Sequence, residues 1–266
     1  MITAIIALIA TQSPVNAQSC IEQAQQLMAG ERFAEAIASV NKCPVTPASL
    51  RLKGIAFYCL YNTDSAHYYL RLAEKSIAVD DSVLVGLAGT LMWKKDSRAA
   101  LSVLEKVRDK KGLSYQGAKA LIHEAKGEYP QALAIYDTVI ASHPKAFSTI
   151  AKKAAVLSWM KKFDESIMLY TEIINASPAS KGEKTAARIR RAEVISWTNR
   201  LDEAIVQLDS TLMIDSKNAT ALVSRGVILE WKGKFKEAKE SYSRALSADP
   251  NNKTARLNIE KLLWVK

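Results

Sequence analysis

The sequence predicts an all-α protein built from one repeated pair of helices, a helical solenoid. Two observations support this fold class: residue types recur in register along the chain, and apolar side chains within one repeat follow helical spacing. Successive members of each register lie 34, 38 and 34 residues apart. Four registers keep this step: Pro144, Pro178, Ser216 and Pro250; Tyr136, Tyr170, Leu208 and Tyr242; Ala132, Ser166, Ala204 and Ala238; and Ala120, Ala154, Ala192 and Gly226.

The last repeat shows how each element is specified. A first apolar-periodic stretch runs over 221–229, with the small residue Gly226 at its middle, and a turn follows at 232–234. A second stretch from Phe235 to Leu246 keeps its apolar side chains on one helical face. Pro250 ends it, because proline disfavours helical geometry in the residue before it. Small residues let the two antiparallel helices approach closely, and the register aromatics fill the space between repeats.

This pattern resembles the tetratricopeptide repeat, which has a period of 34 residues. The resemblance implies a right-handed α-solenoid of about seven helix-turn-helix repeats, with 18–266 forming a single solenoid domain. We place the repeats at about 19–45, 47–80, 81–112, 113–146, 147–180, 183–218 and 219–252, and a capping helix at 253–265. The chain departs from the pattern at Ser216, which replaces a proline, and at an insertion of four residues, 179–182, which we expect to lie in a turn.

The first 17 residues have the pattern of a secretory signal peptide. Residues 2–10 are uncharged and apolar, and Val15-Asn16-Ala17 places small residues at the cleavage site, so cleavage is expected before Gln18. The alternative is a buried N-terminal helix. The apolar run is too short to cross a bilayer, and no later stretch is apolar enough to do so. The sequence therefore predicts an exported protein, periplasmic or secreted.

The cysteines fit an oxidising compartment. Cys20 begins the first helix of the first repeat and Cys43 ends the second, and antiparallel helices bring those ends together. We predict a disulfide between Cys20 and Cys43. The alternative is two free buried thiols. Cys59 is left over in a core-like register.

The formal net charge is +10, which favours an acidic partner and says nothing of the fold. Nucleic acid is not expected, because an exported protein rarely meets it and no motif for it is present.

One site on the first helix of five repeats is basic, and stacked repeats would align these side chains. We call this set the basic column. It is either a row of cations that binds an acidic ligand or a set of inter-repeat salt bridges to Glu193, Glu230 and Glu237. The column comprises Lys53, Lys119, Lys153, Arg191 and Arg225.

Four tryptophans also fall in register: Trp93, Trp159, Trp197 and Trp231. One interpretation is a packing residue that locks the turn inside each repeat. The other is an aromatic floor along a groove, since tryptophan is a frequent hot-spot residue of interfaces.

By resemblance, the first helix of each repeat lines the concave face on which extended peptides lie. This implies a groove whose polar, acidic and basic side chains suit a polar peptide. The candidates are Lys152, Ser158, Trp159, Arg190, Glu193, Ser196, Trp197, Ser224, Glu230 and Trp231.

No motif in the sequence predicts catalysis or metal binding. The three histidines form no cluster at metal-ligand spacing, and neither a phosphate loop nor a nucleophile elbow is present, so no catalytic residue, metal or cofactor is expected. The sequence thus predicts a scaffold that binds a partner protein or peptide in an envelope assembly. The alternative is a protein that handles polysaccharide or another anionic polymer.

Overall fold

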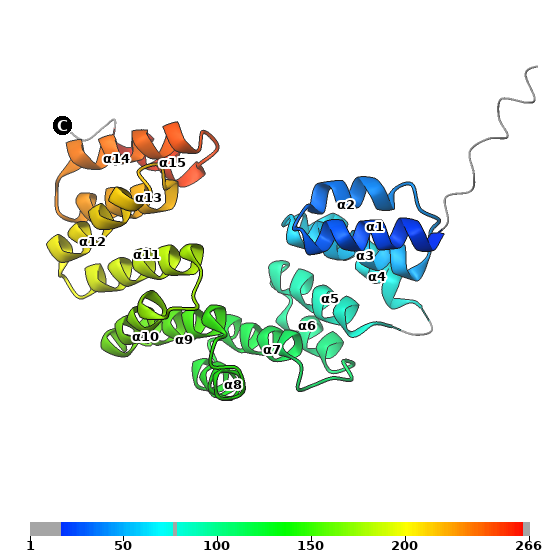
Figure 1. Ribbon diagram of the computed structural model, residues 1–266. Coiled ribbons are helices and arrows are strands. Elements are labelled where there is room, and N and C mark those ends of the chain that lie inside the picture. The colour runs from blue at the N-terminus through cyan, green and yellow to red at the C-terminus, as the bar shows by residue number, and fades with distance from the viewer. Residues whose placement is uncertain (1–16, 77–78, 263–266) are drawn as a thin grey trace, which may run out of the picture. The chain divides into compact units, whose positions relative to one another are not determined.

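The computed structural model describes residues 17–76 and 79–262, and over these residues it is entirely helical, with fifteen α-helices and no strand (Figure 1). The all-α, repeat-built fold predicted from the sequence is therefore confirmed. The predicted signal peptide lies outside the described residues apart from Ala17. No helix of the described residues is long and apolar enough to span a bilayer.

The chain divides into two compact units, Met1–Glu128 and Tyr129–Lys266. The boundary falls inside the expected repeat 113–146, so its two helices belong to different units. The single solenoid domain stays a prediction, and each unit is described by itself.

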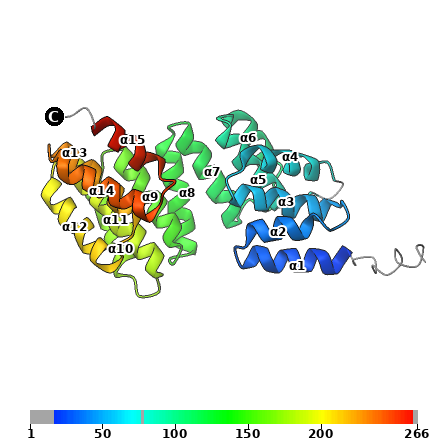
Figure 2. The same ribbon diagram turned by 90° about the horizontal axis from the view of Figure 1, so that it is seen from above.

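The N-terminal unit contains three helix-turn-helix pairs and one further helix. Each first helix contacts the first helix of the following pair, so α1, α3, α5 and α7 form one row (Figure 2). The helices are α1 (Ala17–Ala29), α2 (Phe33–Val40), α3 (Pro47–Cys59), α4 (Thr63–Glu74), α5 (Asp81–Trp93), α6 (Ser97–Leu104) and α7 (Leu113–Ala125).

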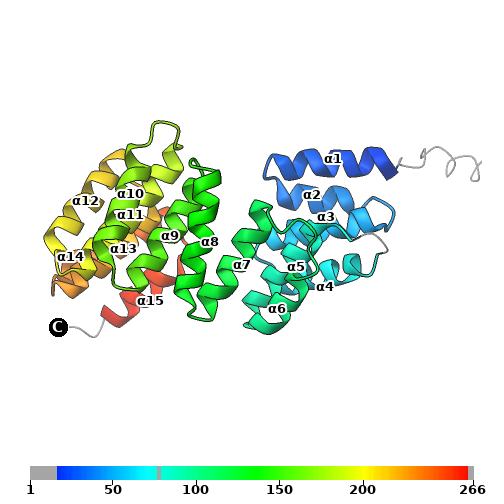
Figure 3. The same cartoon turned by 90° about the horizontal axis from the view of Figure 1, so that it is seen from below.

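The C-terminal unit begins with one helix, continues with three pairs and ends with a short helix. Its first helices α9, α11 and α13 contact one another in order, and α10 and α12 each pack on the following first helix (Figure 3). The helices are α8 (Tyr129–Ser142), α9 (Phe147–Trp159), α10 (Phe163–Asn175), α11 (Lys181–Trp197), α12 (Leu201–Ile214), α13 (Ala219–Trp231), α14 (Phe235–Ala248) and α15 (Lys253–Leu262).

One residue in each predicted repeat has a positive φ, and it always lies in the turn between the two helices. A helix commonly ends with such a left-handed residue, usually glycine, which allows the chain to reverse. Here only two of the seven described positive-φ residues are glycine. The seven are Glu31, Tyr61, Lys95, Gly127, Lys161, Asn199 and Gly233.

The core lies between the two helices of each repeat and between neighbouring repeats. The register residues Ala132, Ser166, Ala204 and Ala238 are fully buried, as are the aromatic rings of Tyr136 and Tyr242. At Ser166 the buried hydroxyl donates a hydrogen bond to the Ala154 carbonyl oxygen at 2.8 Å, so the polar substitution is satisfied. The registers found in the sequence are thus the packing positions of the fold.

The insertion at 179–182 lies in a helix as well as in a turn, which corrects the sequence expectation. Ser180 caps α11 through reciprocal hydrogen bonds with Glu183, and Lys181 and Gly182 are already helical. As a result α11 has 17 residues, whereas α9 and α13 have 13 each. The insertion therefore adds one turn to the N-terminus of α11.

The last described helix, α15, packs on α14 in the position expected for a cap. Its buried residues Ala255 and Leu262 join the apolar cluster that contains Tyr242 and Ala245. Residues 263–265 of the predicted capping helix lie outside the described part of the chain.

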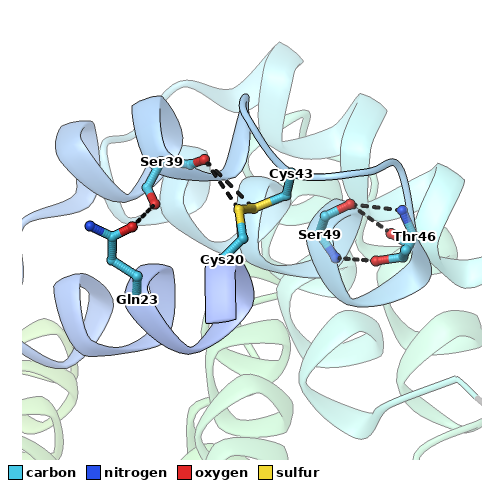
Figure 4. The surroundings of a disulfide bond; sticks show 6 residues. All are labelled: Cys20, Gln23, Ser39, Cys43, Thr46 and Ser49. Atoms are coloured by element: carbon cyan, nitrogen blue, oxygen red, sulfur yellow. Dashed lines mark hydrogen bonds between the residues drawn. A yellow bond between two sulfur atoms is a disulfide. The ribbon is translucent and has the colours of Figure 1, made fainter. Parts of the chain in front are cut away.

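Cys20 of α1 and Cys43 are joined by a disulfide, with their Cα atoms 5.8 Å apart (Figure 4). Cys43 lies three residues beyond the end of α2 rather than within it. The Ser39 carbonyl oxygen lies 3.7 Å from the sulfur of Cys20 and 3.6 Å from that of Cys43. Cys59 is half-buried, and burial raises the pKa of its thiol.

Candidate functional site

The basic column of the C-terminal unit is part of the packing between repeats. Lys153 of α9 contacts Asp137 of α8 at 2.6 Å, and Arg225 of α13 contacts Asp209 of α12 at the same distance. Arg225 also donates a hydrogen bond to the Ser241 hydroxyl of α14 at 2.8 Å. Each cation thus links its own first helix to the second helix of the preceding repeat.

Arg191 occupies the same position without a carboxylate partner. Its guanidinium donates to Thr171 Oγ1 of α10 and to Gln207 Oε1 of α12, both at 3.1 Å. Burial lowers the pKa of Arg191, with a further contribution from the charge of Arg188. In the C-terminal unit the column therefore joins successive repeats whether its partner is charged or neutral.

In the N-terminal unit the column makes contacts with aromatic rings. The ammonium of Lys53 lies 5.0 Å from the ring centre of Tyr69, and that of Lys119 lies 5.9 Å from the ring centre of Tyr115. Nowhere in the described column is the contact the one expected from the sequence, to Glu193, Glu230 or Glu237. The carboxylates that do pair with it come from second helices, because those helices face the column.

Three of the groove candidates form one hydrogen-bonded network between α11 and α13. Arg190 Nη1 contacts Glu193 Oε2 at 2.8 Å, and the Ser224 hydroxyl of the next repeat donates to Glu193 Oε1 at 2.6 Å. The charge of Glu193 raises the pKa of Arg190. The side chain of Arg190 is 62% exposed, so it has donors left for a partner.

A buried tyrosine lies behind this network. Burial raises the pKa of Tyr170 to about 12; the charge of Arg190 lowers this pKa and the charge of Glu193 raises it. Its hydroxyl lies 3.4 Å from the Ala151 carbonyl oxygen. A neutral, buried side chain of α10 therefore lies next to the network.

The other groove candidates divide into exposed and buried residues. Lys152 is exposed. Ser158 and Ser196 are buried and donate to the carbonyl oxygens of Ala155 and Glu193, three residues earlier in their own helices, both at 2.6 Å. The Ser224 hydroxyl is buried as well, at 7% exposure, and is bonded to Glu193, so none of these three serines has a free hydroxyl for a ligand.

Glu230 has an internal partner too. It accepts a hydrogen bond at 2.5 Å from the hydroxyl of Tyr242, whose pKa is raised by burial and by this bond. Glu230 is only partly buried, so its second oxygen remains available.

A cavity of about 420 Å³ lies beside the Arg190 network, between the extra turn of α11 and the start of α13. Sequence reasoning did not find this cavity; the only signal for it was the four-residue insertion that lengthens α11. Asn218 caps α13 and donates a hydrogen bond to Asp215 at 3.1 Å. This bond holds together two of the residues that line the cavity on the α13 side. The charged and polar lining residues are Lys181, Thr185, Arg190, Asp215, Asn218 and Thr220.

The in-register tryptophans are the last residues of their helices and lie half-exposed at the turn, outside the groove network. Trp159 contacts Tyr129, the first residue of α8, with ring centres 6.1 Å apart. Trp197 contacts Phe163, the first residue of α10, at 6.4 Å. The indoles of Trp159 and Trp197 therefore pack against the turn of the preceding repeat, not their own.

Among residues 17–76 and 79–262, no group of three histidine, cysteine, aspartate or glutamate side chains is placed to hold a metal ion. What the arrangement offers is recognition: exposed cations, a fixed carboxylate and a cavity on one row of first helices.

Comparison with known proteins identifies the repeat. Two tetratricopeptide repeat models match the chain, one over residues 112–146 and the other over 219–252. Comparison with curated proteins finds none that matches.

Solved structures with the same fold include a tetratricopeptide repeat protein from Parabacteroides merdae, 14% identical, covering 93% of this chain and 98% of that one with a TM-score of 0.72. The C-terminal part of a repeat-containing protein from Cytophaga hutchinsonii is 15% identical, covers 90% and 99%, and gives 0.52. A chain of the APC/C hetero-tetramer Cut9-Hcn1 is 13% identical and gives 0.60; 98% of this chain matches 58% of that one. At these identities the likeness establishes the fold alone.

Proposed function

We propose that this chain, whose tetratricopeptide repeats are now identified, is a protein-protein interaction scaffold that holds an extended, acidic segment of a partner on α9, α11 and α13. The observation that carries this proposal is the Arg190–Glu193–Ser224 network. It spans two repeats, its atoms are already in hydrogen-bonding positions, and it adjoins a cavity.

The charges around the network favour an acidic segment. Lys152, Lys181 and Arg190 are exposed on or beside the groove. Glu193 and Asp215 are each engaged within the fold. A side-chain or terminal carboxylate of the partner would therefore meet free donors.

The experiment is capture from cell extract by the tagged protein and by two charge-reversal variants. Arg190→Glu removes a groove donor, whereas Lys239→Glu makes the same charge change on α14. The proposal predicts a partner that is retained by wild type and Lys239→Glu and lost by Arg190→Glu. A partner captured equally by all three proteins binds elsewhere and contradicts the groove.

We propose further that the protein is exported and works in the periplasm or outside the cell, as part of an envelope assembly. The apolar N-terminal stretch and the adjacency of Cys20 and Cys43 support this, because disulfides persist in oxidising compartments. Cell fractionation, followed by alkylation without reductant, tests it. Export predicts a periplasmic or secreted chain that begins at Gln18 and in which only Cys59 is labelled. A cytosolic chain with all three thiols labelled contradicts it.

The alternative of anionic-polymer binding is weakened by the basic column. A polyanion ladder needs free cations in a row. Lys153, Arg191 and Arg225 are instead partly buried and bonded to second helices. The net charge of +10 alone does not favour such a polymer over an acidic protein.

A further inference from the structure

A strip of aromatic and apolar side chains follows the turns of the C-terminal unit, on residues that the groove does not use. We call it the turn edge. It consists of the last residue of each first helix and the first residue of each second helix, so its members alternate along the unit. They are Tyr129, Trp159, Phe163, Trp197, Leu201, Trp231 and Phe235.

The indoles of the turn edge are open to solvent. Trp159, Trp197 and Trp231 are 51%, 43% and 54% exposed. Their ring contacts with Tyr129 and Phe163 are tilted at 43° and 58°, so neither aromatic partner is stacked on the indole face.

Trp93 in the N-terminal unit provides the contrast. It occupies the same register, but Tyr58 stacks on it with ring centres 4.4 Å apart and planes 15° apart. Tyr61 lies 5.6 Å from it as well. The structure thus shows how this register looks when an indole face is used for packing.

The charges along the turn edge are mostly neutralised by one another. Lys162 contacts Glu165 at 3.0 Å, Arg200 contacts Glu203 at 2.6 Å, and Lys234 contacts Glu237 at 2.8 Å. Lys232 pairs with Asp202 of the preceding repeat. The edge therefore presents many hydrogen-bond donors and acceptors but little net charge.

This combination excludes several partners. A polyanion meets little net positive charge here, because a carboxylate lies beside each of Lys162, Arg200, Lys232 and Lys234. A bilayer surface is disfavoured by the carboxylates that flank every indole. An uncharged ligand with apolar faces and a rim of hydroxyl groups satisfies both features, because its faces cover the indoles and its hydroxyls bond to the charged pairs.

We propose that the turn edge binds an uncharged chain of β-1,4-linked sugars of the gluco configuration. In such sugars the hydroxyls are equatorial, so each ring has two flat faces of C–H groups that fit an indole. Every second ring of such a chain presents the same face, and the turn edge likewise presents one indole per repeat. This site is independent of the groove, and either can fail without the other.

Lys161 adds to this picture. It is exposed, lies two residues after Trp159 and has a left-handed φ of 61°. Gly233 lies at the equivalent position, two residues after Trp231. Lys95 has the same φ two residues after Trp93, so the left-handed conformation belongs to the turn and Lys161 contributes to the site by its position and exposure. In the proposed complex the Lys161 ammonium donates to a sugar hydroxyl.

The experiment is titration of the full chain with cellohexaose and, separately, hexa-N-acetylchitohexaose, followed by the indole N–H signals in NMR spectra. The two probes share the backbone geometry and distinguish a glucan from a polymer of N-acetylglucosamine. Dextran, with α-linkages, and alginate, an anionic polymer, are the negative controls. The proposal predicts saturable shifts of three indole signals with at least one hexasaccharide.

Variants locate the site. Each of Trp159→Ala, Trp197→Ala and Trp231→Ala is expected to weaken binding about tenfold, and Trp197→Tyr to restore part of it. Trp93→Phe is the matched control and leaves binding unchanged. Circular dichroism melts of every variant separate lost binding from lost folding.

Three outcomes overturn the proposal: neither hexasaccharide shifts the indoles at millimolar concentration, binding survives in the folded triple variant, or alginate binds as well as the neutral probes. Loss of a protein partner in the three alanine variants, without sugar binding in wild type, makes the edge a protein interface and equally overturns it.

Discussion

Gly226 of α13 lies directly against the ring of Tyr242 in α14, with no room for a β-carbon between them. An added Cβ would overlap three atoms of the ring, which is fully buried and hydrogen-bonded to Glu230. The small register of the first helices therefore exists because the aromatic register of the second helices packs onto it.

Gly226→Ala is expected to destabilise the protein by about 1–3 kcal/mol, because the Tyr242 ring must move to admit the methyl group. Gly117→Ala is the matched control. A Cβ at Gly117, within α7, meets nothing within 4 Å, and alanine is the better helix former by about 1 kcal/mol, so this change is expected to stabilise. Urea unfolding measures both, and equal effects of the two substitutions would contradict the packing.

The left-handed turn residues make a second prediction. Lys161 and Gly233 occupy the same place in the first and third helix pairs of the C-terminal unit, with φ of 61° and 78°. Left-handed geometry costs a non-glycine residue about 1–2 kcal/mol, which the greater unfolded-state freedom of glycine partly offsets. Lys161→Gly should therefore stabilise by about 0.5 kcal/mol, whereas Gly233→Lys should destabilise by about 1 kcal/mol. Thermal melts of the two variants test this, and the same sign for both would show that the turn geometry is not as described.

The basic column should contribute to the coupling between repeats. Arg225 and Asp209 are both partly exposed, so the pair is expected to contribute about 0.5–1 kcal/mol, not the value of a buried pair. A double-mutant cycle with Arg225→Met and Asp209→Asn isolates this coupling from other effects of each change. Lys153 and Asp137 provide the equivalent cycle two pairs earlier. No coupling in either cycle would argue against an inter-repeat role.

Asp80 makes the stability of the N-terminal unit depend on pH. It caps α5 by accepting from the Ser82 amide at 2.8 Å, and it contacts Arg51 of α3 at 2.7 Å. Burial by itself would raise the pKa of Asp80, but the hydrogen bonds from Ser82 and the charge of Arg51 outweigh it and lower the pKa below its ordinary value of 3.8. The ionised Asp80 therefore contributes its full stabilisation above its ordinary pKa of 3.8. This stabilisation is lost as the pH falls through the lower pKa that Asp80 has in the folded protein.

Asp80→Asn keeps the capping oxygen but loses the charge. We expect it to lower stability at pH 7 by less than about 1 kcal/mol, since the pair is partly exposed, and the difference from wild type to shrink below pH 4. Denaturation at several pH values measures this. A difference that stays constant in acid would mean that the Asp80 charge does not stabilise the fold.

Much of the fold could be predicted because the same residue types recur at equivalent positions of successive repeats. Residues such as Ala204, Gly226 and Tyr242 recur where two helices touch, and contact between helices depends on side-chain size, which the sequence shows. The role of Lys153 and Arg225 was predictable as salt bridging, but their partners were not. Choosing Asp137 and Asp209 over nearby glutamates requires knowing which helix face lies opposite.

The candidate site was harder to predict. Arg190, Glu193 and Ser224 were named as candidates because the family resemblance points to the first helices, and the structure connects them by hydrogen bonds. Ser158, Ser196 and Ser224 are all buried and bonded within the fold, which their spacing did not reveal, because one residue along a helix turns a side chain by about 100°. The cavity depends on an added helical turn, which sequence alone did not distinguish from a longer loop.

The most direct test of the scaffold proposal is site-specific photocrosslinking in cells, with the photoreactive residue placed at Lys152 or Thr220 in the groove and at Met168 or Val206 on second helices. All four side chains are exposed, so they are matched in access. The proposal predicts adducts with one common partner from the groove positions and none from the second helices. Adducts from Met168 or Val206 alone, or none from the groove in the expressing cell, would contradict it.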